Sequence, residues 1–301
     1  MLDVLGSSVL FAVCNVAWRY GDGPTVGVVF VRALLGAVLG WVLIRRWRRP
    51  SWRTGFGSRP GVVAVVSAAA SMVLAGTMFR SLDGPVAGLA IACTPAVAML
   101  VRDRVGGVAA AAALGSSVAA VVGVVVATGG TGEDTSIGWW SVVVAVAFVA
   151  AEVISMRSAQ LAVEDGLDAT AIVTASMVVV AVITAPFAVV AEAGAGSSAW
   201  GSAIGAGLVV AAFGTIGRVL RTEALPSAGV PTVAASTQIT ALGTAVGGVW
   251  LFADELTGVG VLSAVLAAGL GGLSVVVGTR WRLARDASLA TSLEPAPDRP
   301  G

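Results

Sequence analysis

The chain has 301 residues, of which 57% are hydrophobic and only 12% are charged, and its net charge at neutral pH is +1. Soluble domains carry about 25% charged residues, so this composition excludes an ordinary soluble domain. The near-zero net charge also argues against nucleic acid as a partner, because nucleic-acid-binding proteins carry a strongly basic surface.

Ten long apolar blocks follow one another along the chain. In chain order they are Val4–Tyr20, Pro24–Ile44, Gly61–Phe79, Gly84–Val101, Val105–Thr128, Ile137–Met156, Ala169–Val190, Ala199–Leu220, Ser227–Phe252 and Leu256–Gly278. A membrane-spanning helix needs about 20 mostly apolar residues. A soluble α/β protein would instead place polar helices between short buried strands, and this sequence has none. Because backbone polar groups in lipid must be satisfied within their own segment, each block is predicted to be a helix in a lipid bilayer.

The loops between these blocks alternate in charge. The segment Arg45–Pro60, after the second block, holds six arginines and no acidic residue. Further arginines follow the fourth, sixth, eighth and tenth blocks, namely Arg102, Arg104, Arg157, Arg218, Arg221, Arg280, Arg282 and Arg285. Arginine gathers in cytoplasmic loops, so we expect a multi-pass protein of a bacterial cytoplasmic membrane with both termini in the cytoplasm. The start lacks the features of a cleavable signal peptide, so the first block is expected to remain as a span.

Two stretches of the sequence repeat one pattern of residues. FRSLDGPVAGLA, starting at Phe79, and LRTEALPSAGVP, starting at Leu220, place Arg, Pro, Ala and Gly in the same columns. FAVCN in the first block likewise aligns with FVAAE in the sixth, which sets Asn15 against Glu152. The first pair of stretches joins the third and fourth helix of each of two five-helix units, and because five is odd the second unit enters the membrane inverted. Inverted repeats are typical of secondary transporters, whose substrate site lies near the midplane between the units.

The repeat predicts an all-α membrane protein with ten transmembrane helices as two inverted five-helix repeats. The first repeat covers residues 1–128, a linker loop covers 129–136, and the second repeat covers 137–278. Residues 279–301 end in LEPAPDRPG, whose proline and charge predict a disordered cytoplasmic tail beyond a short basic collar.

Residues 1–278 resemble the EamA-type carriers of the drug/metabolite transporter superfamily. The resemblance rests on RYGDGP at the end of the first block, on Arg32 within VVFVRALLGAVL, and on GPVAGLAIACTPAVAML in the fourth block. VGGVWLFADELTGVGVLSAVLAAGLGG is similar to the end of the family's second unit. The resemblance implies ten helices in two inverted units and a small organic substrate. The stretch MLVRDRV departs from the family because its acidic stop comes early, so the fourth helix is predicted to be short.

The short fourth helix marks one candidate part of a transport pathway. Short or proline-interrupted spans are the best sequence pointer to a transport site, so we place part of the pathway beside Cys93, Thr94 and Pro95. A simple deletion, with a tilted neighbour filling the gap, explains the short helix equally well. Four further polar residues within spans are candidate lining residues or, alternatively, hydrogen-bonding links between helices. They are Asn15 and, in the polar stretch ASTQIT, Ser236, Gln238 and Thr240.

Two charged residues lie deep within predicted spans. Arg32 is near the centre of the second block, and Glu152 lies in the sixth. A charge at that depth is costly, so both are expected to face the bundle interior, as a pair or as two walls of one wet cavity. Glu152 is a candidate proton-coupling acid, and Arg32 is a candidate substrate contact. Alternatively, Arg32 clamps a helix end and Glu152 reaches the inner interface.

The sequence contains no catalytic constellation, no metal-ligand cluster and no Walker loop for ATP, so we expect neither an enzyme nor a cofactor. Cys14 and Cys93 lie in apolar runs, which argues against a disulfide framework. The chain is therefore predicted to export a small organic metabolite or drug by alternating access, driven by proton exchange or solute gradients. A non-transporting membrane subunit or receptor is an alternative that an apolar, fully packed cavity would favour, and a membrane-embedded lipid enzyme is a third. Small-residue pairs such as Gly36 with Gly40 favour close helix packing and allow a homodimer.

Overall fold

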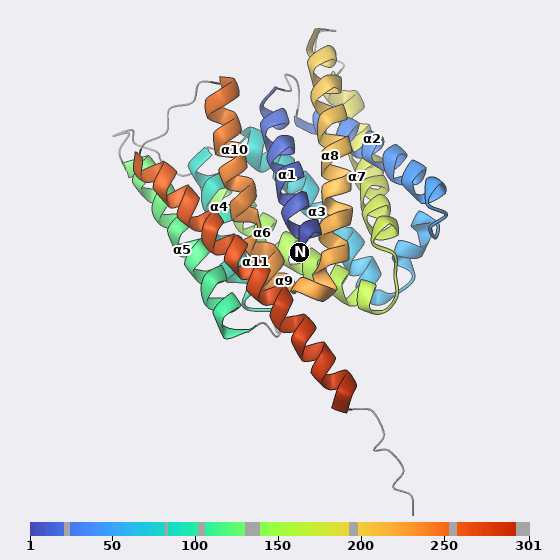
Figure 1. The fold of residues 1–301 in the computed structure, drawn as a ribbon. Coiled ribbons are helices and arrows are strands. Elements are labelled where there is room, and N and C mark those ends of the chain that lie inside the picture. The colour runs from blue at the N-terminus through green and yellow to red at the C-terminus, as the bar shows by residue number, and fades with distance from the viewer. Residues whose placement is uncertain are drawn as a thin grey trace, which may run out of the picture.

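The structure is a computed structural model that describes residues 1–20, 25–81, 84–101, 106–129, 139–192, 198–252 and 258–292. Within these ranges the chain is almost entirely helical and contains no strand (Figure 1). The elements are α1 (Leu2–Tyr20), α2 (Thr25–Arg46), the 3₁₀ helix η1 (Trp52–Phe56), α3 (Arg59–Ser81), α4 (Gly84–Ala98), α5 (Gly107–Gly129), α6 (Trp139–Glu164), α7 (Ala169–Glu192), α8 (Ser198–Ala228), α9 (Val230–Ala235), α10 (Thr237–Phe252) and α11 (Gly258–Ser292).

Each predicted apolar block coincides with helix in the described residues. Seven of the helices are long and apolar enough to cross a membrane: α2, α3, α5, α6, α7, α8 and α11. The predicted short fourth helix is confirmed, since α4 has 15 residues and contains Pro95. The ninth block is interrupted, because α9 ends at Ala235 and α10 starts at Thr237. The all-helical, membrane-type architecture expected from composition is thus what the chain adopts.

Several helices continue beyond the ends predicted from hydropathy. The clearest case is α6, which runs on to Glu164 because polar side chains support one another along it. Arg157 Nη1 donates to Gln160 Oε1 at 2.9 Å, and Gln160 Nε2 donates to Glu164 Oε1 at 3.0 Å. These partners are three and four residues apart, which places them on one face of a helix. Hydropathy marks where a helix leaves lipid, so it misses a polar extension of this kind.

The C-terminal segment differs from the prediction of a disordered tail that starts just after a basic collar. Helix α11 continues to Ser292, and residues 293–301 lie outside the described part of the chain. Arg282 is buried at 4% exposure, and its Nη1 donates to the carbonyl oxygen of Pro226 at 2.9 Å. Anchoring on α8 and the good helix formers Arg, Leu and Ala explain the extra turns.

The helices pack mainly across the two halves of the chain. The most extensive pairings are α5 with α11, α3 with α6, α2 with α7, and α1 with α8. Figure 1 shows α5 and α11 side by side at one edge of the bundle and α1 beside α8 at its centre. Each pairing joins a helix from before residue 130 to one from after it, so the halves interlock as one bundle.

Close helix approaches occur at two of the small-residue pairs in the sequence. A Cβ atom on Gly40 of α2 would meet the side chain of Thr174 on α7, and one on Gly247 of α10 would lie 2.6 Å from Val16 Cγ2 on α1. Gly205, by contrast, has no neighbouring atom within 4 Å of its Cβ position. Glycine therefore lets α2 approach α7, and α10 approach α1, more closely than any larger residue would allow.

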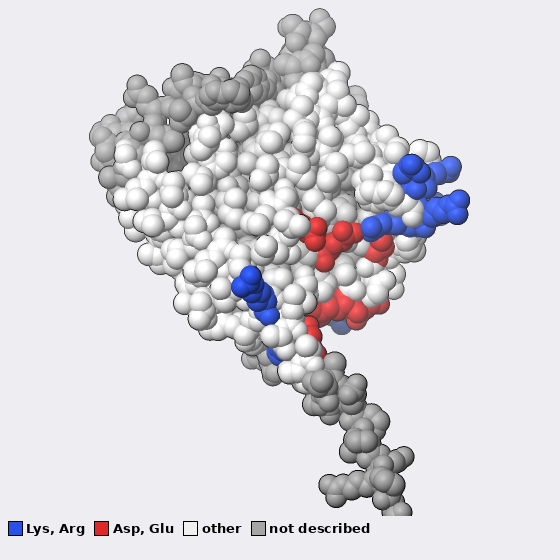
Figure 2. Space-filling view, viewed as in Figure 1, with Lys and Arg blue, Asp and Glu red and all other residues white. Residues whose placement is uncertain are grey.

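Charged residues tie several helix ends together on one side of the bundle. Arg49, just after α2, forms ion pairs with Asp168 at 3.0 Å and with Glu223 at 2.7 Å, and it donates to Thr170 Oγ1 at 3.1 Å. These bonds, the hydrogen bond that Arg49 donates to Glu223 foremost, raise the pKa of Arg49 above its usual value. Figure 2 shows charged side chains along the right and lower parts of the visible face and uncharged residues over the other parts that are drawn in white. The arginine-rich segment after α2, the α6–α7 loop and the end of α8 thus share one side.

Candidate functional site

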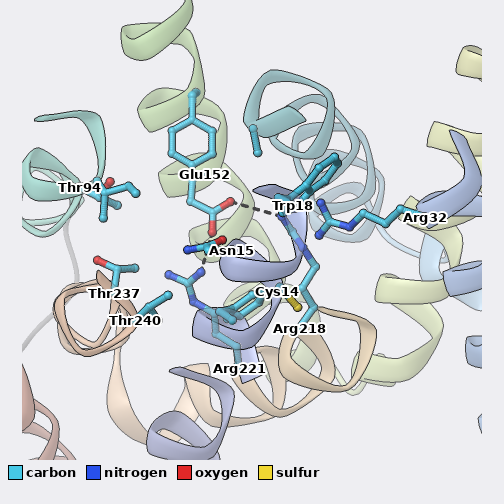
Figure 3. Close-up of a pocket in the computed structure, with 14 residues that line it drawn as sticks. Cys14, Asn15, Trp18, Arg32, Thr94, Glu152, Arg218, Arg221, Thr237 and Thr240 are labelled. Carbon is cyan, nitrogen blue, oxygen red and sulfur yellow. Dashed lines mark hydrogen bonds and ion pairs between the residues drawn. The ribbon is translucent and has the colours of Figure 1, made fainter. Parts of the chain in front are cut away.

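A polar cavity lies where helices from both halves of the chain meet. It has a volume of about 90 Å³, and α1, α2, α3, α4, α6, α8 and α10 all contribute to its wall. Its polar and charged lining residues, most of which Figure 3 labels, are Cys14, Asn15, Arg32, Thr94, Glu152, Arg218, Arg221, Thr237 and Thr240. Its aromatic residues are Phe11, Trp18 and Phe148. Several deep polar residues from distant parts of the chain therefore converge on one cavity.

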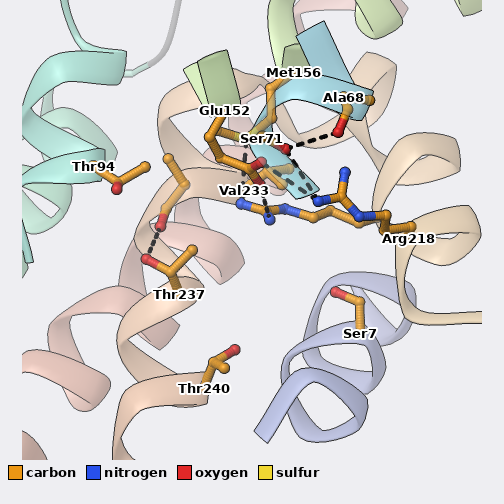
Figure 4. Close-up of polar contacts among 12 residues, drawn as sticks. Ser7, Ala68, Ser71, Thr94, Glu152, Met156, Arg218, Val233, Thr237 and Thr240 are labelled. Atoms are coloured by element: carbon orange, nitrogen blue, oxygen red, sulfur yellow. Dashed lines mark hydrogen bonds and ion pairs between the residues drawn. The ribbon is translucent and has the colours of Figure 1, made fainter. Parts of the chain in front are cut away.

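Glu152 forms the ionic centre of this cavity. Its Oε1 lies 2.7 Å from Arg221 Nη1, and its Oε2 lies 3.8 Å from Arg218 Nη2. Arg218 Nη2 also donates to Ser71 Oγ at 3.2 Å, and Ser71 in turn donates to the carbonyl oxygen of Ala68 at 3.1 Å (Figure 4). The two arginines are three residues apart on α8 and so project from one face of that helix. One carboxylate on α6 thereby links α8 to α6, and Arg218 links α8 to α3.

Arg32 forms another wall of the same cavity. Its side chain is 6% exposed, and its guanidinium carbon lies 5.3 Å from the centre of the Trp18 ring, which places the cation over an aromatic face. Its Nε is buried without a hydrogen-bond partner among the described residues. Arg32 also forms no ion pair with a described carboxylate, whereas Glu152 is paired with the α8 arginines. Of the two arrangements predicted for Arg32 and Glu152, the structure shows two walls of one cavity.

The hydroxyl groups of the lining are committed to the backbone. Thr94 donates to the carbonyl of Ala90 at 2.9 Å, and Thr240 donates to that of Ser8 at 3.1 Å. Thr237 donates in the same way to the carbonyl of Ala234, and the Asn15 amide donates to Thr244 Oγ1 at 3.3 Å. The guanidinium groups are therefore the main hydrogen-bond donors that the described lining can offer to a ligand.

The structure brings together five of the residues proposed from sequence: Asn15, Arg32, Thr94, Glu152 and Thr240 line the cavity. It places the other four outside the lining. Cys93 faces an apolar hollow between α4 and α6, and Ser236 Oγ donates to the carbonyl of Val233 at 2.7 Å. Pro95 and Gln238 belong to a local arrangement at the contact of α4 and α10.

Pro95 and Gln238 compensate for each other. Proline has no N–H, so the carbonyl of Ile91, four residues earlier, loses its partner within the helix. Gln238 Nε2 donates to that carbonyl from α10 at 3.2 Å. Just after the proline, the backbone N–H of Ala96 donates to Ser117 Oγ on α5 at 3.2 Å. Neighbouring helices thus satisfy the backbone groups around the proline in α4. Of the two roles predicted for Gln238, the structure shows the hydrogen-bonding link between helices.

The most important residues that sequence reasoning missed are Arg218 and Arg221. Their position at the end of the eighth apolar block predicts that both belong to the cytoplasmic arginines. In the structure α8 continues to Ala228, so both arginines lie well inside the helix and turn toward Glu152. The available signal was their spacing of three residues, which places both on one face of a helix. Four further residues line the cavity without having been proposed for it: Phe11, Cys14, Trp18 and Phe148. Thr237, which belongs to the predicted lining stretch ASTQIT, lines it as well.

The fold and this buried ionic centre define a multi-pass helical membrane protein with a polar cavity inside the bundle. No family model matches the chain, and no curated protein matches its sequence. The chain is similar to a solved structure described only as a crystal structure of a protein, with a TM-score of 0.68 and 14% sequence identity. The match covers 92% of this chain and 97% of that one, and it shows a shared fold.

Proposed function

We propose that the protein is a secondary transporter that exports a small organic solute across a bacterial cytoplasmic membrane by alternating access. The observation that carries this proposal is the polar cavity enclosed by helices of both halves of the chain. Transporters built from inverted repeats hold their substrate at the interface of the repeats. A subunit without transport activity would have no need for buried charges around a hollow, because such charges are costly within a bilayer.

The pattern of helix packing supports two related halves. In chain order, each helix of the first half has an equivalent in the second half: α1 corresponds to α6, α2 to α7, α3 to α8, α4 to α9 with α10, and α5 to α11. Exchanging the halves turns the α1–α8 pairing into α6–α3, and the α1–α10 pairing into α6–α4, all of which occur. The α2–α7 and α5–α11 pairings map onto themselves. This is the packing expected for two five-helix repeats around a pseudo-two-fold axis, with α9 and α10 counted as one interrupted span in a total of ten.

The cavity lining supports the same correspondence. The aligned motifs FAVCN and FVAAE begin with Phe11 and Phe148 and end with Asn15 and Glu152. All four of these residues line the cavity, two from α1 and two from α6. If the pseudo-two-fold axis passes through the cavity, equivalent residues of the two repeats should both line it, as these residues do. The repeat at Arg80 offers no such check, because the side chain of Arg80 lies outside those described.

The interruption between α9 and α10 supports a transport site at this position. Gly229, which precedes α9, has a φ of 87°, a left-handed conformation that glycine adopts without strain. Thr237 and Thr240, just after the break, both line the cavity. Discontinuous helices are the elements from which transporters build their binding sites.

The small volume of the cavity fits a closed conformation. Binding pockets for drug-sized ligands are about 300–1,000 Å³, whereas this cavity is about 90 Å³. It has room for a few water molecules or for one small chemical group. A larger solute would enter only after helices move apart, and alternating access supplies such a movement. Proton coupling would act through Glu152, the carboxylate of the described lining.

Solute flux in proteoliposomes tests the proposal. Purified protein is reconstituted, and uptake or release of a broad panel of metabolites is followed with and without a pH gradient. We expect protein-dependent flux of at least one small organic solute, and acceleration by a pH gradient if protons are exchanged. Empty liposomes are the control. No flux of any panel member under either condition would count against transport.

A further inference from the structure

The cavity contains more positive than negative charge. Three guanidinium groups, those of Arg32, Arg218 and Arg221, share the described lining with the single carboxylate of Glu152, so the net charge is +2. Charged groups within a bilayer are costly unless they are paired or hydrated. Arg221 is paired at 2.7 Å, but Arg32 has no described counter-ion. A bound solute can supply the negative charge that the described part of this lining lacks.

The arrangement of the arginines defines where such a charge would be bound. Arg32 and Arg218 line the same cavity from α2 and α8, so their like charges repel each other. Figure 3 shows both side chains reaching the space beside Trp18, from α8 and from α2. The Nε atoms of Arg32 and Arg218 are both buried without a hydrogen-bond partner among the described residues. An oxyanion between the two guanidinium groups would accept hydrogen bonds from them and weaken their mutual repulsion.

We propose, on the basis of the transport function above, that the cavity binds the oxyanion of a small organic acid. Arg32 and Arg218 hold the oxyanion, and Glu152 is an internal counter-ion that the bound anion displaces from Arg218. The contact between Glu152 and Arg218 is the weaker of its two ion pairs, at 3.8 Å against 2.7 Å for Arg221. The bound acid therefore competes with a carboxylate of the protein itself.

The lining also indicates the body of this acid. Its walls include Phe11, Trp18 and Phe148, together with Ile91 and Ala75. The threonine hydroxyls of the lining already donate to backbone carbonyls, so they offer no free hydrogen to a polar body. A compact carboxylate with an apolar or aromatic body matches these walls better than inorganic phosphate, which has no apolar surface to bury.

Binding by the wild-type protein in lipid nanodiscs is the first test. The probes are benzoate, the matched cation benzylamine, the neutral benzyl alcohol and inorganic phosphate, and the readout is the rise in Tm with ligand concentration. We expect benzoate to raise Tm, phosphate to raise it less, and the cation and the neutral compound to have no effect. Equal or larger shifts with benzylamine would overturn the proposal. A larger rise in Tm with phosphate than with benzoate would overturn the proposal that the ligand has an apolar or aromatic body.

Two variants with opposite expected effects test the roles of the charges. Arg32→Gln removes a donor of the site, so benzoate binding should weaken by about tenfold or more. Glu152→Gln removes the competing carboxylate, so benzoate binding should tighten. The matched control is Arg282→Gln, which alters a buried arginine outside the cavity and should leave benzoate affinity unchanged.

A purely structural role for Glu152 predicts weaker binding in Glu152→Gln, and that result would contradict displacement. If Arg32→Gln does not fold, Arg32→Lys keeps the charge but loses the planar fork, and it should weaken binding to an intermediate extent. Unchanged benzoate affinity in the folded arginine variant would overturn the assignment of Arg32.

The proposal and the transport function can fail separately. Benzoate binding without flux of any solute in proteoliposomes would support the anion site and contradict the proposed transport function. Flux of a cationic or neutral solute that benzoate does not inhibit would support the transport function and contradict the anion site.

Discussion

Glu152 is the residue whose environment differs most from what the sequence indicates. The sequence marks it as a deep acid and offers Arg32 as its partner, whereas its ion-pair partners lie on α8, two helices further along the chain. The assignment of arginines to cytoplasmic loops rests on where an apolar block ends. It fails for Arg218 and Arg221, because α8 continues through them to Ala228. Hydropathy cannot distinguish an arginine beyond a helix from one that pairs within the bundle.

Removal of the Glu152 side chain should be strongly destabilising. In Glu152→Ala, Arg218 and Arg221 keep their buried charges but lose their carboxylate. Breaking a buried ion pair on one side typically costs about 3–5 kcal/mol. Thermal unfolding in one fixed detergent measures the loss. Asp165→Ala, at an exposed position after α6, is the control and should change stability by no more than about 0.5 kcal/mol. Equal unfolding temperatures for the two variants would show that the pair contributes nothing.

The proline break in α4 gives a prediction at the scale of single elements. Gln238→Leu leaves the carbonyl of Ile91 without a donor, and a hydrogen bond of this kind within a membrane is worth about 0.6 kcal/mol, up to about 1.7. Pro95→Ala restores a backbone N–H to that carbonyl. The combined variant should therefore lose less stability than Gln238→Leu alone. A double-mutant cycle by thermal unfolding measures the coupling, and strictly additive effects would contradict the compensation.

The close approach of α2 and α7 gives a second prediction about elements. Gly40→Ala places a Cβ atom against Thr174, so the two helices must move apart, which should cost about 1–3 kcal/mol. Gly205→Ala is the matched control because nothing lies near its Cβ position. There, alanine should leave stability unchanged or raise it by up to about 1 kcal/mol through its higher helix propensity. Thermal unfolding of the two variants side by side decides the matter, and loss in the control alone would refute the packing argument.

The sequence predicted the helices better than their partners. Blocks of apolar residues located every described α-helix, with one block covering both α9 and α10, and early charge after the fourth block predicted the short α4. Asn15 and Glu152 were paired by an internal alignment, and both line the cavity. Gln238 stands two positions before Thr240 and so faces another side of α10, and Ser236 lies at the break between α9 and α10, where its hydroxyl donates to the backbone. Which face points inward depends on tertiary packing, and an evenly apolar helix has no polar stripe to reveal it.

At the scale of the whole molecule, the ends of the helices predict the accessibility of introduced cysteines. In a background with Cys14→Ala and Cys93→Ala, the variants Ser51→Cys and Asp165→Cys should react with a membrane-impermeant thiol reagent from the same face. Both positions are exposed, and Arg49 links their loops through Asp168. Trp139→Cys, at the exposed start of α6, should react from the opposite face. Labelling of intact cells and of inverted vesicles measures the sides, and one common side for all three would contradict the multi-pass arrangement.

The chain contains neither lysine nor histidine, and this has a consequence for its response to acid. Arginine stays protonated throughout the range that living cells experience, and histidine is the usual sensor near neutrality. The positive charge of the arginines on α2 and α8 therefore does not change with pH in this range. Any pH dependence of ligand binding in the described cavity must therefore come from the one carboxyl group, that of Glu152. Replacing this group by an amide should make binding there independent of pH.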